Sequence, residues 1–111
     1  MIRERVIASL HACAVALGQL ADGTQWHLFG SVDRNEVNAS DIDLMILCQD
    51  DEQADALREI IDPEAFVLPL HMALMTYDEA AEVDAVRVQK SHVVFAFPTI
   101  RSTDDTSETF R

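Results

Sequence analysis

Two short runs decide the fold of this chain, Leu28-Phe29-Gly30-Ser31 and Ser40-Asp41-Ile42-Asp43-Leu44. The first is an apolar run that ends in Gly-Ser, and the second opens an apolar segment with two aspartates. Nine residues, most of them polar, separate Ser31 from Asp41. Because residues of this kind favour loops, the pattern predicts a strand, a loop over residues 30–40 and a second strand over residues 41–48.

Two aspartates, Asp41 and Asp43, lie two positions apart in the second predicted strand. Side chains alternate between the faces of a strand, so we expect both carboxylates on one face and Ile42, Leu44 and Ile46 on the other face, toward the core. Neighbouring carboxylates repel each other and raise a pKa unless a cation offsets their charge. Oxygen ligands favour Mg²⁺ or Mn²⁺ over Zn²⁺. Asp41 and Asp43 are therefore candidate metal ligands.

The Gly-Ser pair provides features that suit a phosphate group. Gly30 lets the backbone approach a ligand closely, and Ser31 offers a hydroxyl and an N–H. If Ser31 opens a helical turn, its free N–H groups would face a phosphate. Arg34 has two interpretations, a bidentate phosphate contact or a surface ion pair with a neighbouring acid. A phosphate cradle beside a carboxylate-bound metal is the equipment for phosphoryl or nucleotidyl transfer.

This arrangement resembles the signature of the polymerase-beta-like nucleotidyltransferase superfamily, in particular its minimal nucleotidyltransferases, which are small standalone domains. Their pattern is a hydrophobic residue, Gly-Ser, a loop of about this length, and Asp-x-Asp among hydrophobic residues. Arg34 falls where the family commonly has a basic residue, whereas Asn35 stands where a glycine is frequent. The strong similarity covers residues 28–47, and the order of elements extends it more weakly to about residue 90.

The resemblance implies a role for each motif residue. Gly30 and Ser31, with Arg34, would bind the phosphates of ATP or another nucleoside triphosphate. Asp41 and Asp43 would be catalytic residues that bind Mg²⁺ or Mn²⁺. The implied reaction transfers a nucleoside monophosphate, AMP by default, to a hydroxyl acceptor. In several family members that acceptor is a HEPN-type toxin, and the transferase is its antitoxin.

The family also places a third carboxylate on a neighbouring strand, and here the chain departs from the pattern. The strand predicted over residues 65–75 has no Asp or Glu, and its only ionisable residue is His71. A neutral His71 can accept a proton and is the third catalytic candidate, but histidine is a poor substitute for a carboxylate on Mg²⁺. The alternative is a catalytically degenerate module that binds a partner protein. A carboxylate from elsewhere, for example Glu36, would favour catalysis.

The remaining elements are predicted from hydrophobic periodicity and end signals. Helices are expected over residues 3–21, 50–61 and 77–90, the last one beginning with a capping box at Thr76 and Glu79, and further strands over residues 25–29 and 93–97. In the last helix, Val83 and Val86 are expected to face inward. Trp26 is open to two interpretations, a core aromatic, which we favour, or a base-stacking platform.

Composition bounds the class of protein. The order of elements over residues 1–100 predicts one small α/β (α+β) domain, a mixed sheet flanked by helices, followed by a polar tail at 101–111 that we expect to be disordered. The net charge of −12 argues against nucleic-acid binding but not against nucleotide binding, and it suits a basic protein partner. No run has membrane-spanning length or the features of a signal peptide, so a cytoplasmic location is expected. The oligomeric state stays open.

Overall fold

The computed structural model describes residues 2–98, and its order of elements confirms the predicted α+β class. The elements, in chain order, are α1 (Ile2–Leu17), the short 3₁₀ helix η1 (Gly18–Ala21), β1 (Gln25–Phe29), α2 (Gly30–Asp33), β2 (Ile42–Cys48), α3 (Asp51–Ile60), β3 (Leu70–Thr76), α4 (Tyr77–Glu82), α5 (Ala85–Val88) and β4 (His92–Ala96). The tail predicted at residues 101–111 lies outside the described residues.

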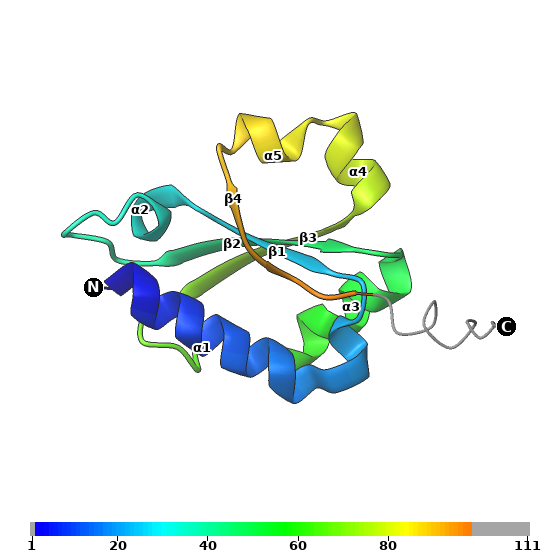
Figure 1. The fold of residues 1–111 in the computed structure, drawn as a ribbon, viewed down its shortest axis with the longest axis horizontal. Helices are drawn as coiled ribbons and strands as arrows, with labels where there is room; N and C mark the ends of the chain where they lie inside the picture. The colour runs from blue at the N-terminus through cyan, green and yellow to red at the C-terminus, as the bar shows by residue number, and fades with distance from the viewer. Residues whose placement is uncertain (1, 99–111) are drawn as a thin grey trace, which may run out of the picture.

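The four strands form one mixed sheet in the order β3-β2-β1-β4 (Figure 1). β1 runs antiparallel to both β2 and β4, whereas β2 and β3 are parallel. The parallel pair requires a crossover, which α3 supplies. As a result the beginning of β2 and the beginning of β3 lie at the same end of the sheet, next to the end of β1.

Helices α1 and α3 cover one face of the sheet and enclose the main core (Figure 1). Ile42, Leu44 and Ile46 are fully buried in this core, as the alternation in β2 predicted. Trp26 is also fully buried there, and its indole N–H donates to the Thr24 hydroxyl at 2.9 Å. The interpretation of Trp26 as a core aromatic is therefore correct, and a base-stacking role is excluded.

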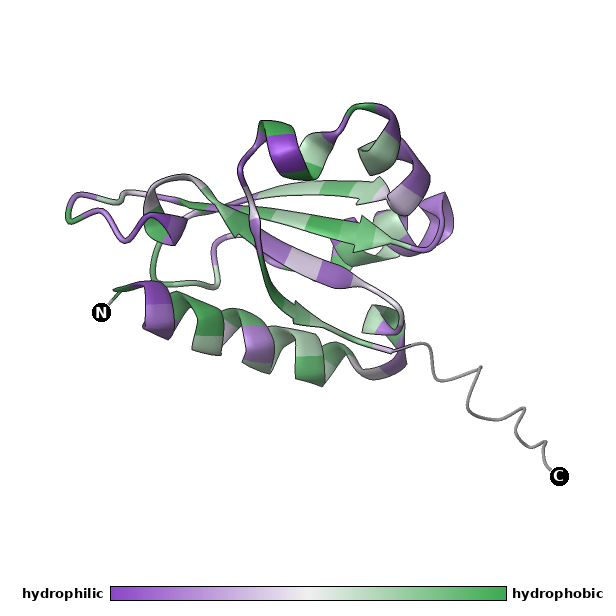
Figure 2. Cartoon of the chain, turned by 45° about the horizontal axis from the view of Figure 1, so that its top comes forward, coloured by the Kyte–Doolittle hydropathy of each residue, from purple (hydrophilic) through white to green (hydrophobic). Residues whose placement is uncertain are grey.

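Helices α4 and α5 cover part of the opposite face (Figure 1). A second, smaller cluster forms there, in which Met45 and Leu47 of β2 pack with Ala80 and Ala85. The first residues of β2 extend past these helices toward α2. Figure 2 shows apolar strands in the centre, with the polar loop after α2 projecting from this end of the sheet.

Two predicted elements differ from the structure. The strand predicted over residues 65–75 is shorter, because residues 62–69 form turns and β3 begins only at Leu70. Pro69 stands immediately before β3, where its missing N–H costs no ladder hydrogen bond. Its carbonyl instead accepts the N–H of Ile42 at 2.8 Å, which fixes the start of β2 beside the start of β3.

The helix predicted over residues 77–90 is broken in two. The capping box of Thr76 and Glu79 is present and starts α4 as predicted. Asp84 then adopts a left-handed conformation with φ of 53°, which ends the helix and allows α5 to start in a new direction. The break shifts the buried face, so that Ala85 is buried, Val83 is exposed and Val86 lies at the surface.

None of the helices among residues 2–98 has both the length and the apolar character needed to cross a membrane.

Candidate nucleotide and metal site

The candidate residues gather at the end of the sheet where β1 leads into α2. In the antiparallel pair Phe29 lies opposite Asp43, and in the parallel pair Asp43 lies opposite His71. Residues paired in this way share a face of the sheet. The ladder therefore places Asp43 between the Gly-Ser turn on one side and His71 on the other.

The Gly-Ser pair opens a single helical turn inside the segment predicted as a loop, which is the condition under which its N–H groups would face a phosphate. α2 begins at Gly30 directly after β1, and the Arg34 N–H donates to the Gly30 carbonyl at 3.1 Å. Gly30 has φ of +77°, and a Cβ atom built on it would lie 2.1 Å from Oδ2 of Asp43. Both the conformation and the space exclude a side chain, so glycine is what allows the backbone to approach the Asp43 carboxylate.

The two aspartates lie at the edge between core and solvent. Asp41 immediately precedes β2, and its side chain is 39% exposed. Asp43 is half-buried on the face away from α1 and α3. Burial raises the pKa of Asp43 above its usual value, and the negative charge of Asp41 raises it further, while His71 and Arg34 act in the opposite direction. The site therefore carries an excess of negative charge that a bound cation would offset.

His71 comes close to this carboxylate pair from β3. Its Nε2 lies 3.4 Å from Oδ2 of Asp41, and its side chain is 64% exposed. It thus lies opposite Asp43 on the neighbouring strand, the strand on which the resemblance implied a third carboxylate. The ring is accessible to an acceptor group that approaches from solvent.

Arg34 and Glu36, which were alternatives in the sequence, pair with each other. Nε of Arg34 donates to Glu36 at 2.7 Å, and both side chains are well exposed. Glu36 therefore does not supply the third carboxylate in this structure. Arg34 therefore forms the surface ion pair that was one of its two interpretations. Its positive charge still lowers the pKa of Asp43.

The two aspartates fit a metal ion that is bound partly by the protein and partly by a substrate better than a metal ion held by protein side chains alone. Among residues 2–98 there is no group of three or more His, Cys, Asp or Glu side chains placed to hold a metal ion. Mg²⁺ commonly takes only one or two protein carboxylates and completes its octahedron with substrate phosphates and water. Asp41 and Asp43 match that pattern, and the Gly30 backbone packs directly against the Asp43 carboxylate.

One buried group beside the site was not identified from the sequence. The side chain of Asp33, the last residue of α2, is only 3% exposed and contacts Arg3 of α1 and His92 of β4. These partners are 30 and 59 positions away along the chain, so no local pattern could reveal them.

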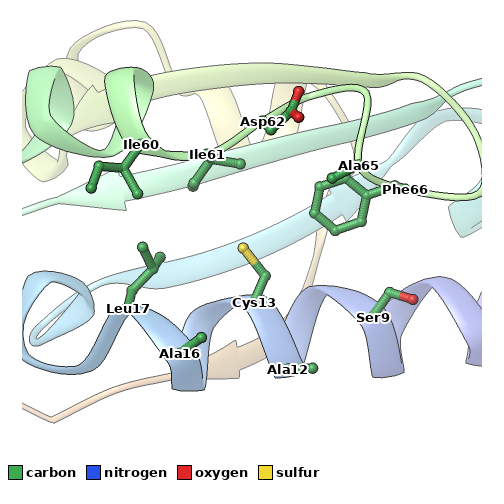
Figure 3. A pocket seen from close by; sticks show the side chains of 10 residues that line it. All are labelled: Ser9, Ala12, Cys13, Ala16, Leu17, Ile60, Ile61, Asp62, Ala65 and Phe66. Carbon is green, nitrogen blue, oxygen red and sulfur yellow. The ribbon is translucent and has the colours of Figure 1, made fainter.

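A separate hollow of about 590 Å³ lies between α1 and the segment 60–66 (Figure 3). Its lining is mainly apolar, with Ser9, Cys13 and Asp62 as exceptions, and the described residues that line it include no Lys or Arg. Because α1 and α3 cover the face of the sheet opposite to Asp43, this hollow is not part of the candidate site. Its chemistry also does not suit a phosphate.

Fold and site together define a small α+β domain built to place a Gly-Ser turn against paired carboxylates. Residues 13–96, more than half of the chain, match the family described as nucleotidyltransferase domain. The chain belongs to the nucleotidyltransferase domain family, whose reaction is the transfer of a nucleoside monophosphate from a nucleoside triphosphate and whose members generally use divalent metals. No curated protein and no solved structure gave a significant match.

Proposed function

We propose that this protein is a Mg²⁺-dependent adenylyltransferase that transfers AMP from ATP to a hydroxyl of a HEPN-type toxin and acts as its antitoxin in the cytoplasm. The observation that carries the proposal is the contact between the Gly30 backbone and the Asp43 carboxylate, which sets the Gly-Ser turn directly against the candidate metal ligands. The family match supports transfer of a nucleoside monophosphate. ATP and the HEPN-type acceptor are proposed from the resemblance of residues 28–47.

The proposed chemistry is a displacement at the α-phosphorus of ATP. The acceptor oxygen forms a bond to that phosphorus, the bond to the oxygen that bridges to the β-phosphate breaks, and pyrophosphate leaves with the bonding electrons. Gly30 and Ser31 hold the phosphates through the α2 turn, and Asp41 and Asp43 bind the cation. Bound Mg²⁺ would offset the charge of the phosphates and of the departing pyrophosphate.

The acceptor proton needs a base, and His71 is the proposed one. Nδ1 of a neutral His71 takes the proton, while Nε2, 3.4 Å from Oδ2 of Asp41, keeps its hydrogen toward that carboxylate, which stabilises the resulting imidazolium. A surface-exposed base suits a macromolecular acceptor better than a small enclosed one. The net charge of −12 disfavours a nucleic-acid acceptor, which leaves a protein hydroxyl as the favoured class.

A second candidate function is a degenerate transferase that binds a partner and no longer catalyses. It is favoured by one observation, that His71 rather than a carboxylate lies opposite Asp43. In this case the site would keep its binding of Mg²⁺ and ATP without transferring AMP, and the site end of the sheet would serve as a protein contact. The two functions differ in whether AMP is transferred.

The test is a calorimetric titration of ATP into the protein with and without Mg²⁺. We expect metal-dependent binding by the wild type and its loss in Asp41→Asn/Asp43→Asn, which keeps the shape of both side chains. The matched control is Glu52→Gln/Glu59→Gln, which removes two exposed carboxylates from α3 on the other face of the sheet. Equal binding by the wild type and the aspartate variant would overturn the assignment of the site.

Transfer itself is measured on a purified HEPN-type protein by mass spectrometry. An added AMP that depends on ATP, Mg²⁺ and Asp43 supports the adenylyltransferase. Mg²⁺-ATP binding without any transfer favours the degenerate module instead.

A further inference from the structure

Asp33 is a charged residue whose side chain is 97% shielded from solvent, although it lies in a one-turn helix at the surface. A buried carboxylate is costly unless it is paired and hydrogen-bonded. Asp33 belongs to α2, the same turn that contains Gly30 and Ser31. The partners of its carboxylate therefore also determine how that turn is held.

Both oxygens of Asp33 are engaged by side chains from distant elements. Arg3 of α1 contacts Oδ1 through Nη2 at 3.1 Å and Nε at 3.3 Å, and Nε also donates to the Asp33 carbonyl at 3.1 Å. On the other side, Nδ1 of His92, the first residue of β4, lies 2.6 Å from Oδ2. An ionised carboxylate only accepts, so this nitrogen carries the proton.

These contacts join α2 to α1 and to β4, and they add to the anchoring by Val32 of the same turn, which is fully buried in the main core. A single helical turn cannot hold its own shape, because nucleation costs more than its few hydrogen bonds return. On its C-terminal side α2 continues into the exposed loop of residues 34–40. The contacts of Asp33 with Arg3 and His92, which we call the brace, therefore hold the C-terminal end of the turn, next to the buried Val32.

We propose that Asp33 is a positioning residue for the nucleotide site, and that Arg3 and His92 hold it so that Gly30 and Ser31 face the Asp43 carboxylate. Asp33 itself points away from the site and touches no substrate. This inference rests on the proposed function, because it assumes that the α2 turn binds phosphate. It adds that binding depends on contacts made on the far side of that turn.

A purely electrostatic role of Asp33 and a positioning role predict opposite effects of Asp33→Asn on the affinity for ATP. Removing a negative charge close to the phosphate turn should tighten ATP binding if electrostatics alone acted. A positioning role predicts weaker binding, on the order of tenfold, as found for residues that orient ligand groups in other sites. Arg3→Met should weaken Mg²⁺-ATP binding similarly. Arg3→Lys keeps the positive charge but loses the paired guanidinium donors, so its affinity for Mg²⁺-ATP should lie between those of Arg3→Met and the wild type.

The experiment measures the Kd for ATP with Mg²⁺ in the wild type and in these three variants. Arg58→Met is the matched control, because it breaks an exposed ion pair with Asp55 (2.7 Å) on α3 and should leave the Kd unchanged. The second measurement is amide hydrogen exchange over residues 29–35 without nucleotide. We expect faster exchange in this segment in Asp33→Asn, while β2 keeps its protection.

The outcomes separate the brace from the proposed function. Unchanged or tighter binding in Asp33→Asn, in a wild type that binds Mg²⁺-ATP, overturns the positioning role and leaves the function standing. Weaker binding with faster local exchange supports it. Faster exchange in a protein whose wild type binds no nucleotide overturns the proposed function and reduces the brace to a structural contact. If Asp33→Asn does not fold, Arg3→Lys carries the same comparison.

Discussion

A methyl group on Gly30 would lie 2.1 Å from Oδ2 and 3.0 Å from Cγ of Asp43, so the turn and the carboxylate fit together only without a side chain at residue 30. Gly30 also has φ of +77°, where an L-residue is strained. This pair links the run that ends in Gly30-Ser31 to the run that contains Asp41 and Asp43. It connects the end of β1 to the beginning of β2 across the site.

Gly30→Ala is expected to weaken Mg²⁺-ATP binding on the order of tenfold or more, because the Asp43 side chain must rotate away. The backbone strain costs about 1–2 kcal/mol, and an off-rotamer Asp43 adds roughly 1 kcal/mol. Chemical denaturation measures the stability and calorimetry the affinity. The control is Gly18→Ala, since Gly18 has φ of +60° but no atom within 4 Å of the added Cβ.

The comparison of these two substitutions separates the effect of the contact with Asp43 from the conformational cost of alanine at a positive φ. Gly18→Ala reports the conformational cost alone and should leave nucleotide binding intact. If Gly30→Ala destabilises no more than Gly18→Ala and binds ATP normally, the contact with Asp43 has no consequence.

Asp43→Asn is expected to stabilise the nucleotide-free protein at pH 7. The pKa of Asp43 in the folded protein is raised, mainly by burial and then by Asp41. Asp43 therefore favours folding only at pH values where its carboxyl is protonated, below its pKa in the unfolded chain. This contribution to the free energy of unfolding is lost as pH rises through the raised pKa of the folded state. Removing the charge should raise the free energy of unfolding by about 0.5 kcal/mol, which corresponds to a rise of roughly 2–4 °C in Tm for a domain of this size. The gain should shrink below about pH 4, where the unfolded carboxyl is protonated.

Thermal scans at pH 4 and pH 7 check this expectation, and the same scans with Mg²⁺-ATP provide the control. The ligand should raise the Tm of the wild type and not that of Asp43→Asn. A lower Tm for Asp43→Asn than for the wild type at pH 7 without ligand would contradict the assigned direction.

His71→Gln is expected to lower kcat for AMP transfer on the order of a hundredfold while the KM for ATP stays unchanged, because only proton removal is lost. His71→Asp would instead add an oxygen ligand opposite Asp43 and should tighten Mg²⁺ binding. Steady-state kinetics and a metal titration separate these effects. Full activity in His71→Gln would rule out His71 as the base, and activity gained only in His71→Asp would point to a degenerate site.

Trp26→Phe is expected to destabilise the protein by about 1–2 kcal/mol without affecting nucleotide affinity. The substitution removes the indole donor to Thr24 and part of the packing on Phe95, whose ring centroid is 5.1 Å away. Denaturant unfolding and ATP calorimetry measure the two properties. A large loss of affinity at unchanged stability would contradict the assignment of Trp26 as a purely structural core residue.

Features set by local sequence were predictable. The alternation of Asp41, Ile42, Asp43 and Leu44 predicted a strand with its carboxylates turned from the core, because side-chain direction in a strand follows from position alone. The Gly-Ser turn and the capping box at Thr76 were visible for the same reason. The left-handed Asp84 was not, since an aspartate inside a helical pattern gives no signal that the chain turns there.

The sequence by itself therefore determined most of the elements, the α+β class and the residues Gly30, Ser31, Asp41 and Asp43 as a candidate set. Only the tertiary structure decided what surrounds them. The parallel register that sets His71 opposite Asp43 depends on how far the chain travels through α3 and the turns before β3. The burial of Asp33 between Arg3 and His92 depends on the packing of α1 and β4 around α2. Contacts between distant residues are fixed by the packing of whole elements, and no local run of sequence encodes them.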